Sequence, residues 1–382
     1  MGVILAVTTL VTVISFVEGM NKYVAERIAN LGSNVFGVDR FGVITSLEEF
    51  IRARRRPPLT HDDYRFLKEH LTYSKEIAAV QFWRAEVRYA GELLADVRLQ
   101  GVTPNFTEVT NIVLGSGRLL NETDDRHRAP VCFVGPDIST RFFPHTDPVG
   151  KQIRVGSQMY QIVGVGAPLG SVFGQSQDNY VHIPMGTFEK SWQPREYSLR
   201  MFVQAWNTEL IPEAQDEVRV LMRAKRHVRY SDRDNFAIVT SATFMTLWEQ
   251  ITGNIARMAV GLTMVFLVVG GVVIMNIMLA SVTERTREIG IRKSLGARRR
   301  HILMQFLMES ATLSLTGGML GVLLAYALGA LITAATPLPI HLPLGAVLLG
   351  LSLSTAVGLF FGIYPAMRAA RLDPIVALRF EN

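Results

Sequence analysis

The sequence predicts an α-helical membrane protein with four transmembrane helices, one before and three after a large extracytoplasmic α+β domain. Mean hydropathy is +0.23 with only 19% charged residues, which is too apolar for an ordinary soluble domain. The apolar residues gather in four blocks without Asp, Glu, Lys or Arg, at 1–17, 258–282, 310–336 and 342–367. Each of the last three exceeds the roughly 20 residues that cross a bilayer as a helix. Between the first two blocks lie about 240 residues of globular composition, enough for one or two domains.

The first block is the shortest, because Glu18 follows it directly. No basic residue precedes the block and no small-residue cleavage site is evident after it, so an uncleaved transmembrane helix at 1–18 is expected rather than a signal peptide. Apolar residues continue at helical spacing over 20–31. We therefore expect the helix to rise out of the membrane and to end at Gly32.

The extracytoplasmic domain, predicted at 19–255, has the pattern of a mixed α and β fold. Helical patterns occupy 60–70, which opens on Thr60 with Asp62 and Asp63 in its first turn, and 211–226. A single Cys132 excludes an intrachain disulfide and is expected to be a buried core residue. Strand-like stretches occur at 34–38, 77–82, 85–89, 95–99, 131–134, 152–155, 160–165 and 180–183.

The segment 284–300 lies between the second and third apolar blocks and carries seven Lys and Arg residues. Short loops rich in Lys and Arg stay in the cytoplasm, whereas the loop 337–343 between the last two blocks has neither residue. Counting crossings backwards places 19–255 outside and the N-terminus inside. The net charge of +6 lies largely in these membrane-flanking segments, so no nucleic-acid partner is expected.

Motifs for catalysis, cofactor binding or metal binding are missing from the sequence. There is no G-x-x-x-x-G-K-[ST], no H-E-x-x-H, no G-x-S-x-G and no Cys/His ligand cluster. The chain is therefore predicted not to be an enzyme, with no catalytic, cofactor or metal site. The three later blocks hold no ionisable residue apart from Glu309 at the entry of the third, which disfavours an ion pathway through the helices.

The third block carries a stripe of small residues at every fourth position, which lets another helix approach closely. Packing within one subunit and a dimer face are both open interpretations of this stripe. Its members are Gly317, Gly321, Ala325 and Gly329.

Several motifs in order resemble one family, the MacB-type permeases of ABC transporters in the FtsX-like superfamily. The resemblance covers nearly the whole chain and implies an FtsX-like permease domain at 256–382. It also implies a porter-like external part interrupted by a β-rich insertion at about 101–168. The motifs are E-R-T-R-E-I-G-I-R-K-S-L-G-A at 284–297, Y-P-A-M-R-A-A-R-L-D-P-I-V-A-L-R at 364–379, E-G at 18–19 with L-G-S-N at 31–34, and segments 101–106, 117–120, 147–151 and 163–165.

The resemblance implies that 284–300 forms a coupling helix that docks on a separate ABC ATPase subunit, which binds the ATP and Mg. It implies a homodimeric permease in the inner membrane, a periplasmic location for the external domain, and an adaptor and outer-membrane channel as further partners. The expected mechanism is mechanotransmission that drives efflux or export. The coupling residues would be Glu284, Arg285, Arg287, Glu288, Arg292 and Lys293 for charge, Ile289, Ile291 and Leu295 for apolar contact, and Gly290 and Gly296 to end or bend the helix.

Other functions remain open from the sequence. Within the same superfamily the chain could release lipoproteins, activate a cell-wall hydrolase, or act as a sensor subunit. The basic segment could also serve only as a topological anchor in the lipid. Members of the family normally begin before the first span, so the N-terminus at Met1 is expected to be cut or mis-started.

Overall fold

The computed structural model describes residues 1–29, 34–172, 174–192, 198–335 and 342–378. The chain divides into two compact units. The helical unit comprises Met1–Val24 and Leu247–Asn382, and the α/β unit comprises Ala25–Thr246. The last two residues of the helix predicted at 20–31, Gly32 and most of the loop predicted at 337–343 lie outside the described residues.

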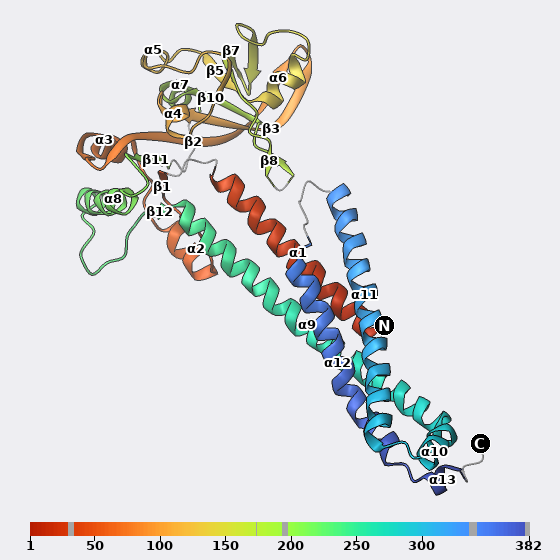
Figure 1. The fold of residues 1–382 in the computed structure, drawn as a ribbon. Coiled ribbons are helices and arrows are strands. Elements are labelled where there is room, and N and C mark those ends of the chain that lie inside the picture. The colour runs from red at the N-terminus through yellow and green to blue at the C-terminus, as the bar shows by residue number, and fades with distance from the viewer. Residues whose placement is uncertain (30–33, 173, 193–197, 336–341, 379–382) are drawn as a thin grey trace. The chain divides into compact units, whose positions relative to one another are not determined.

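Four helices of the described chain are long and apolar enough to cross a membrane, which confirms the predicted fold class. Shorter helices α10 (Thr286–Ser294) and α13 (Pro374–Leu378) lie together at one end of the helical unit (Figure 1). The four long helices are α1 (Gly2–Ala29), α9 (Ser241–Glu284), α11 (Arg299–Ala335) and α12 (Leu344–Arg371).

Two of the long helices extend well beyond the charge-free blocks predicted as spans. Helix α9 begins at Ser241, far before the apolar run, and α11 begins at Arg299 rather than at Ser310. Charged residues indicate where the chain leaves the hydrocarbon core of the bilayer. The helix itself continues into water without a break, because it satisfies its own backbone hydrogen bonds. Each of these two helices is therefore longer than the charge-free run that it contains.

Helix α1 is the most enclosed of the four. In its apolar window 44% of residues are buried, compared with 33%, 22% and 28% in α9, α11 and α12. The backbones of α1 and α9 meet at glycines, since a Cβ added to Gly2 would lie 2.6 Å from the Cα of Gly270. Val7 of α1 contacts Gly321 of α11 and Gly350 of α12. The first span therefore packs against each of the other three.

In the α/β unit, ten described strands form one mixed sheet, in the order β12-β1-β11-β2-β3-β10-β5-β7-β4 with β6 paired to β2 and β7. Strand β10 runs parallel to β3 and antiparallel to β5. The strands are β1 (Val35–Asp39), β2 (Ser74–Tyr89), β3 (Glu92–Val102), β4 (Leu114–Gly117), β5 (Val131–Val134), β6 (Gln152–Val155), β7 (Gln158–Gly166), β10 (Tyr180–Pro184), β11 (Arg200–Ala205) and β12 (Ala237–Val239). A separate pair is formed by β8 (Ser171–Val172) and β9 (Gln175–Ser176).

Strand β2 corrects one prediction, because it is a single strand where two were expected. The register shifts between Ala85 and Val87, at a bulge that disturbs the alternation of buried and exposed residues without ending the strand. A tight turn then leads into β3, with positive φ at Ala90 (49°) and Gly91 (88°), as two-residue hairpin turns require.

Short helices complete the α/β unit. The predicted helices at 60–70 and 211–226 are confirmed as α3 and α8, and Thr60 and Asp63 form a reciprocal capping box at the start of α3. The sequence analysis missed helices α2, α4, α5, α6 and α7 and strands β4, β8, β9, β11 and β12. The helices are α2 (Leu47–Arg54), α3 (His61–His70), α4 (Phe106–Val109), α5 (Glu122–Arg126), α6 (Pro136–Phe142), α7 (Met185–Ser191) and α8 (Ile211–Lys225).

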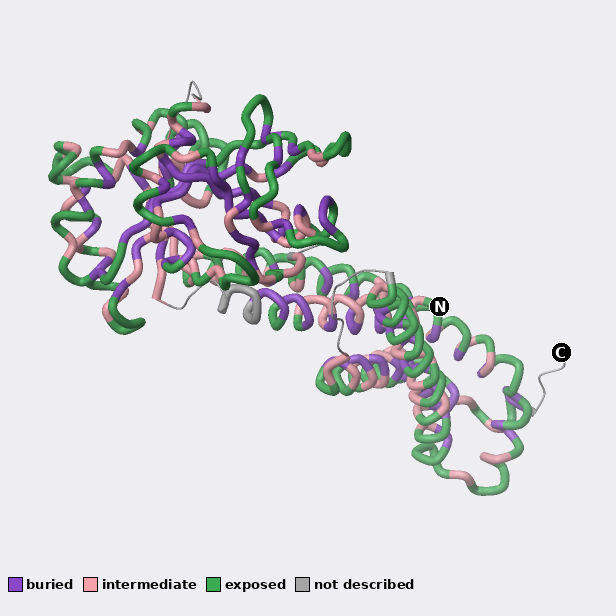
Figure 2. The backbone as a smooth tube through the Cα atoms, turned by 90° about the horizontal axis from the view of Figure 1, so that it is seen from above, coloured by how far each residue is buried: buried purple, intermediate pink, exposed green. Residues whose placement is uncertain are grey.

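The core of the α/β unit lies along its strands, where Figure 2 shows the buried residues gathered. Cys132 is fully buried, as predicted, and burial raises the pKa of its thiol. Asp63 and Arg226 form an ion pair 2.6 Å long between side chains less than a tenth exposed, which joins α3 to the end of α8. Burial opposes ionisation of Asp63, but the hydrogen bonds from Arg226 and Thr60 prevail and hold its pKa below the usual value.

Candidate functional site

Helix α10 is the centre of the predicted coupling segment and follows α9 almost without interruption. Its C-terminus is closed by two backbone bonds, from Gly296 N to Lys293 O (3.0 Å) and from Ala297 N to Arg292 O (3.0 Å). This pair of hydrogen bonds requires a residue with a left-handed backbone conformation directly after the helix. Gly296 is that residue, with φ +95°. Gly290 lies inside the helix and is buried, so of the two glycines predicted to end or bend the helix it is Gly296 that follows its end.

One side of α10 is fixed within the chain. Ile289 is 2% exposed and packs in the core of the helical unit. The Nζ of Lys293 donates to the carbonyl oxygens of Ala370 and Leu372, both at 2.6 Å. Burial, with Arg299 nearby, lowers the pKa of Lys293. These bonds satisfy the last carbonyls of α12 and attach α10 to that end of the fourth span.

One ion pair and one hydrogen bond join α10 to the start of α11, and a second ion pair lies within α10. Arg292 donates to Glu288 at 2.5 Å and to the side-chain oxygen of Gln305 at 2.7 Å. Arg285 pairs with Glu309 at 3.3 Å. Exposed pairs of this kind stabilise by about 0–1 kcal/mol each, so their main effect is to orient the side chains.

The opposite side of α10 is exposed. Ile291 is 44% exposed and Leu295 is 83% exposed, and both follow Arg287 at intervals of four residues. Residues at this spacing share one helix face. Arg287 and Glu284 are exposed and form no ion pair within the described chain. We call Arg287, Ile291 and Leu295 the outer face of α10.

The structure thus divides the predicted coupling residues into three groups. The inner group is Ile289, Gly290 and Lys293. The paired group is Arg285, Glu288 and Arg292, and the exposed group is Glu284, Arg287, Ile291, Leu295 and Gly296.

The small-residue stripe of α11 contacts α1 of the same chain. A Cβ on Gly321 would lie 2.9 Å from the carbonyl oxygen of Ile4, and one on Gly317 would contact Val3. The hydroxyl of Thr8 donates to the carbonyl of Gly321 at 3.0 Å. Ala325 and Gly329 continue the stripe and are buried.

A second small-residue interface, between α11 and α12, was missed by the sequence analysis. The hydroxyl of Ser354 donates to the carbonyl of Ser314 at 2.5 Å. A Cβ on Gly358 would lie 1.9 Å from Ser314 Oγ, and one on Gly362 would lie 2.2 Å from Ser310 Oγ. The signal was available, because Ser354, Gly358 and Gly362 recur at every fourth position.

Clusters able to hold a metal ion, meaning three or more His, Cys, Asp or Glu side chains, do not occur among the described residues. What the site offers is a mechanical connection, since α10 is bound on one side to the ends of two membrane helices and open on the other.

One span, an α/β unit, three spans and a short helix between two of the spans define a membrane protein of the permease type. A family model described as MacB-like periplasmic core domain matches residues 1–221, and one described as FtsX-like permease C-terminal matches residues 260–374. The chain belongs to the MacB-type, FtsX-like family of ABC transporter permeases.

Similar proteins carry the name "Macrolide export ATP-binding/permease protein MacB". Over its whole length the chain is 30% identical to the protein of Bdellovibrio bacteriovorus and 33% identical to that of an Azoarcus species. It spans 58% and 56% of the length of these relatives.

Two solved structures are similar to part of this chain. The periplasmic region of MacB from Actinobacillus actinomycetemcomitans is 17% identical with a TM-score of 0.48, covering 59% of this chain and 98% of its own. The extracellular domain of the noncanonic ABC-type transporter YknZ from Gram-positive bacteria is 18% identical with a TM-score of 0.43, covering 54% and 100%.

Proposed function

We propose that this chain is the permease of a MacB-type ABC transporter in the inner membrane, with the α/β unit in the periplasm and α10 in the cytoplasm. A separate ATPase subunit binds ATP and Mg and docks on the outer face of α10. The observation that carries the proposal is the division of α10 into a side bonded to α12 and α11 and an exposed side with two aliphatic residues and an arginine. An apolar pair flanked by charge is what a helix presents to a groove on a partner.

The proposed mechanism is mechanotransmission. A displacement of the ATPase moves α10, and its bonds to Ala370 and Leu372 carry the motion into α12. Helix α9 leads directly into α10 and extends unbroken from Ser241 to Glu284, a length of about 66 Å at 1.5 Å per residue. Rigid helices transmit displacement where flexible loops would absorb it. Motion at α10 thus reaches the residues that enter the α/β unit.

The output is the efflux or export of a substrate, by two permease copies whose periplasmic domains change separation. A periplasmic adaptor and an outer-membrane channel are proposed as further partners. Substrate passage between the spans is not required by this mechanism. The described spans accordingly need no ionisable groups in their apolar runs.

Site-specific photo-crosslinking tests the docking face. A benzoylphenylalanine at Ile291 or Leu295, in cells that produce the full chain, is expected to crosslink an ABC ATPase identified by mass spectrometry. The same probe at Val220, which is 65% exposed on α8 of the α/β unit, is the matched control. Adducts at Ile291 and Leu295 that contain no ATPase, or an ATPase adduct at Val220, would show the proposal to be wrong.

An activity measurement supplements the crosslink. Leu295→Asp places a charge on the outer face without touching the bonds of Lys293, so it is expected to lower ATP hydrolysis by the reconstituted complex about tenfold. Val220→Asp, an equal change on an exposed helix, is expected to leave the rate unchanged.

A further inference from the structure

Helix α2 of the α/β unit presents large apolar side chains to solvent. Leu47 is 75% exposed, Phe50 is 42% exposed and Ile51 is 49% exposed. Residues three and four positions apart are neighbours on a helix surface, so these three side chains form one stripe. Arg54 continues the stripe one turn further along. In an ordinary surface helix such a stripe faces the core. We call Leu47, Phe50 and Ile51 the apolar stripe of α2.

A different side of α2 packs on the α/β unit. Ala53 is fully buried, and at 3.6 residues per turn it points to nearly the opposite side from Ile51. The start of the helix is fixed as well, because the Ser46 hydroxyl accepts from the backbone N of Glu49 at 3.2 Å. The apolar stripe is therefore not the face that holds the helix in place.

Hydrogen bonds attach the end of α2 to the segment that follows β1. The guanidinium of Arg40 donates to the carbonyl oxygens of Arg54 at 2.9 Å and Arg56 at 2.7 Å. In return Arg56 donates to the carbonyl oxygens of Arg40 at 3.0 Å and Phe41 at 3.2 Å. These bonds keep the apolar stripe turned outward, since turning it inward would break them.

The segment before α2 also contacts β12. At Gly42, where φ is +69°, an added Cβ would lie 2.5 Å from the Cβ of Ala237. Strand β12 ends at Val239 and α9 begins at Ser241, while β1 is the first strand after α1. The two strands beside α2 are thus the ones that connect to membrane spans. A bilayer is therefore tethered to the unit that carries α2, which makes contact between them an intramolecular event.

Positive charge accompanies the apolar stripe. Arg54 and Arg55 are exposed and form no ion pair with any described residue. The acidic side chains of α2 are already engaged, because Glu48 pairs with Arg52 at 2.6 Å and Glu49 accepts from the Thr45 hydroxyl at 2.9 Å. A guanidinium matches the geometry of a phosphate with its fork of donors. Unpaired arginines beside exposed Leu, Ile and Phe are typical of helices that lie in the headgroup region of a membrane.

We infer that α2 binds the surface of the membrane that α1 and α9 span, where it contacts anionic phospholipids. The apolar stripe enters the boundary between headgroups and acyl chains, to a depth of about 5–10 Å. Arg54 and Arg55 donate hydrogen bonds to lipid phosphates. This interaction surface goes beyond the proposed transport function and does not depend on it.

Fluorescence quenching by lipid tests the contact. The full chain carries an NBD label at Leu47→Cys, and Cys132 does not react because it is fully buried. The chain is placed in nanodiscs of phosphatidylcholine and phosphatidylglycerol, without nucleotide or ATPase. A lipid with a nitroxide on its headgroup is expected to lower the emission by about half, because the label lies among headgroups. The same label at Val220→Cys, which is 65% exposed on α8, is expected to lose less than about a tenth.

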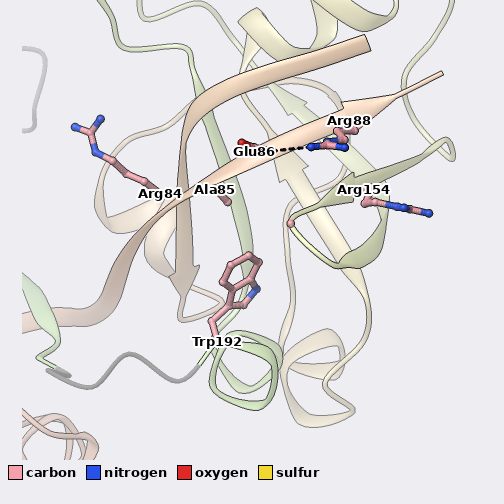
Figure 3. A pocket seen from close by; sticks show the side chains of 7 residues that line it. Arg84, Ala85, Glu86, Arg88, Arg154 and Trp192 are labelled. Atoms are coloured by element: carbon pink, nitrogen blue, oxygen red, sulfur yellow. Dashed lines mark hydrogen bonds and ion pairs between the residues drawn. The ribbon is translucent and has the colours of Figure 1, made fainter. Parts of the chain in front are cut away.

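Charge variants identify the lipid chemistry. Arg54→Gln with Arg55→Gln is expected to reduce the quenching at Leu47 about twofold, and omission of phosphatidylglycerol is expected to do the same. The matched control is Arg154→Gln, at an exposed arginine of β6 that extends away from Trp192, whereas the neighbouring Arg88 pairs with Glu86 (Figure 3). This control is expected to leave the quenching unchanged.

A third variant tests the apolar stripe. Phe50→Ser with Ile51→Ser is expected to abolish the quenching at Leu47, since little apolar area then enters the lipid. The thermal unfolding midpoint of every labelled variant verifies that the α/β unit is folded.

Three results would overturn the inference. The first is equal quenching at Leu47 and Val220. The second is an equal loss with Arg154→Gln and with the α2 arginine variants, which would indicate a diffuse attraction of the whole unit to anionic lipid. The third is a label at Leu47 that is shielded from iodide in water but not quenched by the nitroxide lipid, which would show that protein, such as a second copy of the chain, covers the stripe.

Discussion

At the scale of single residues, His182 of β10 is held without charge inside the α/β unit. It is 1% exposed and lies among the rings of Tyr180 and Phe133, with centroids 4.5 Å and 5.9 Å away. Its Nδ1 has no hydrogen-bond partner in the described structure. Burial, aided by the charge of Arg98, lowers the pKa of His182 to about 3. The imidazole is therefore neutral in the folded protein at any physiological pH.

This histidine predicts a loss of stability on acidification. In the unfolded chain its pKa is about 6.5, so the unfolded state binds a proton below that pH while the folded state does not. Stability is full above pH 6.5 and falls as the pH drops toward 3. Between pH 7.5 and pH 5 the loss due to this residue is about 2 kcal/mol, at 1.36 kcal/mol per pH unit.

His182→Phe is expected to abolish this part of the pH dependence, because Phe fits among the neighbouring rings and does not titrate. The measurement is the thermal unfolding midpoint of the α/β unit in the full chain at pH 7.5 and pH 5. His145→Gln, at an exposed position, is the control and is expected to keep the wild-type decline. An unchanged decline in His182→Phe would contradict the assignment.

The sequence predicted the strand that holds His182 but not its burial. Y-V-H-I-P has one polar residue among apolar ones and does not indicate how many faces are buried, whereas β10 lies between β3 and β5 and all five residues are buried. Those neighbours are far away in sequence, so the burial of a strand on both faces cannot be read from the strand alone.

At the scale of elements, the α11–α12 interface depends on the absence of side-chain atoms. At Gly358 an added Cβ would lie 1.9 Å from the Oγ and 2.5 Å from the Cβ of Ser314, with the carbonyl of Ser310 at 2.8 Å. Backbone atoms cannot move aside as the end of a flexible side chain can. The two helices must therefore separate if a methyl group is added here.

Gly358→Ala is expected to lower the thermal midpoint of the helical unit by several degrees, since overpacking typically costs about 1–3 kcal/mol. Gly261→Ala in α9 is the matched control, because nothing lies within 4 Å of its added Cβ. That change is expected to be neutral or slightly stabilising. Adding Ser314→Gly to Gly358→Ala is expected to restore part of the loss. Equal midpoints for the two alanine variants would contradict the proposed close contact.

The sequence predicted helix α10 as a surface element but could not assign its two sides. Apolar and charged residues alternate through it, so Ile289 and Ile291 look equivalent in sequence. Their environments differ because Ile289 packs in the core of the helical unit, whereas Ile291 is 44% exposed. Long-range contacts of this kind decide which residues remain free for a partner.

At the scale of the whole molecule, the order of spans and α/β unit along the chain was predictable from the sequence, but the pairing of strands in the sheet was not. Bilayer thickness sets the length of apolar runs, so four charge-free blocks were enough to place one helix before and three after the α/β unit. The sheet pairs β1 with β11 and β3 with β10, which are distant in sequence. Short strand patterns carry no information about such pairings.

The mechanotransmission proposal makes a prediction for the entire chain. Helix α9 is continuous from Ser241 to Glu284, so its first turns and its apolar run move as one rod. A proline inside a helix removes a backbone hydrogen bond and kinks the helix, at a cost of about 3 kcal/mol. Ala256→Pro, just before the apolar run, is therefore expected to interrupt the transmission while the outer face of α10 remains intact.

The separation between the α/β units of two copies is the quantity to measure. A spin label at Ser231→Cys reports it, because that position is exposed, whereas Cys132 is fully buried and its raised pKa keeps the thiol protonated and unreactive. With Ala256→Ser the separation is expected to change between the nucleotide-free and ATP-bound complexes as in the wild type. With Ala256→Pro the change is expected to fall by at least half, while the ATPase still copurifies. A full change with Ala256→Pro would mean that motion reaches the α/β unit by a route other than α9.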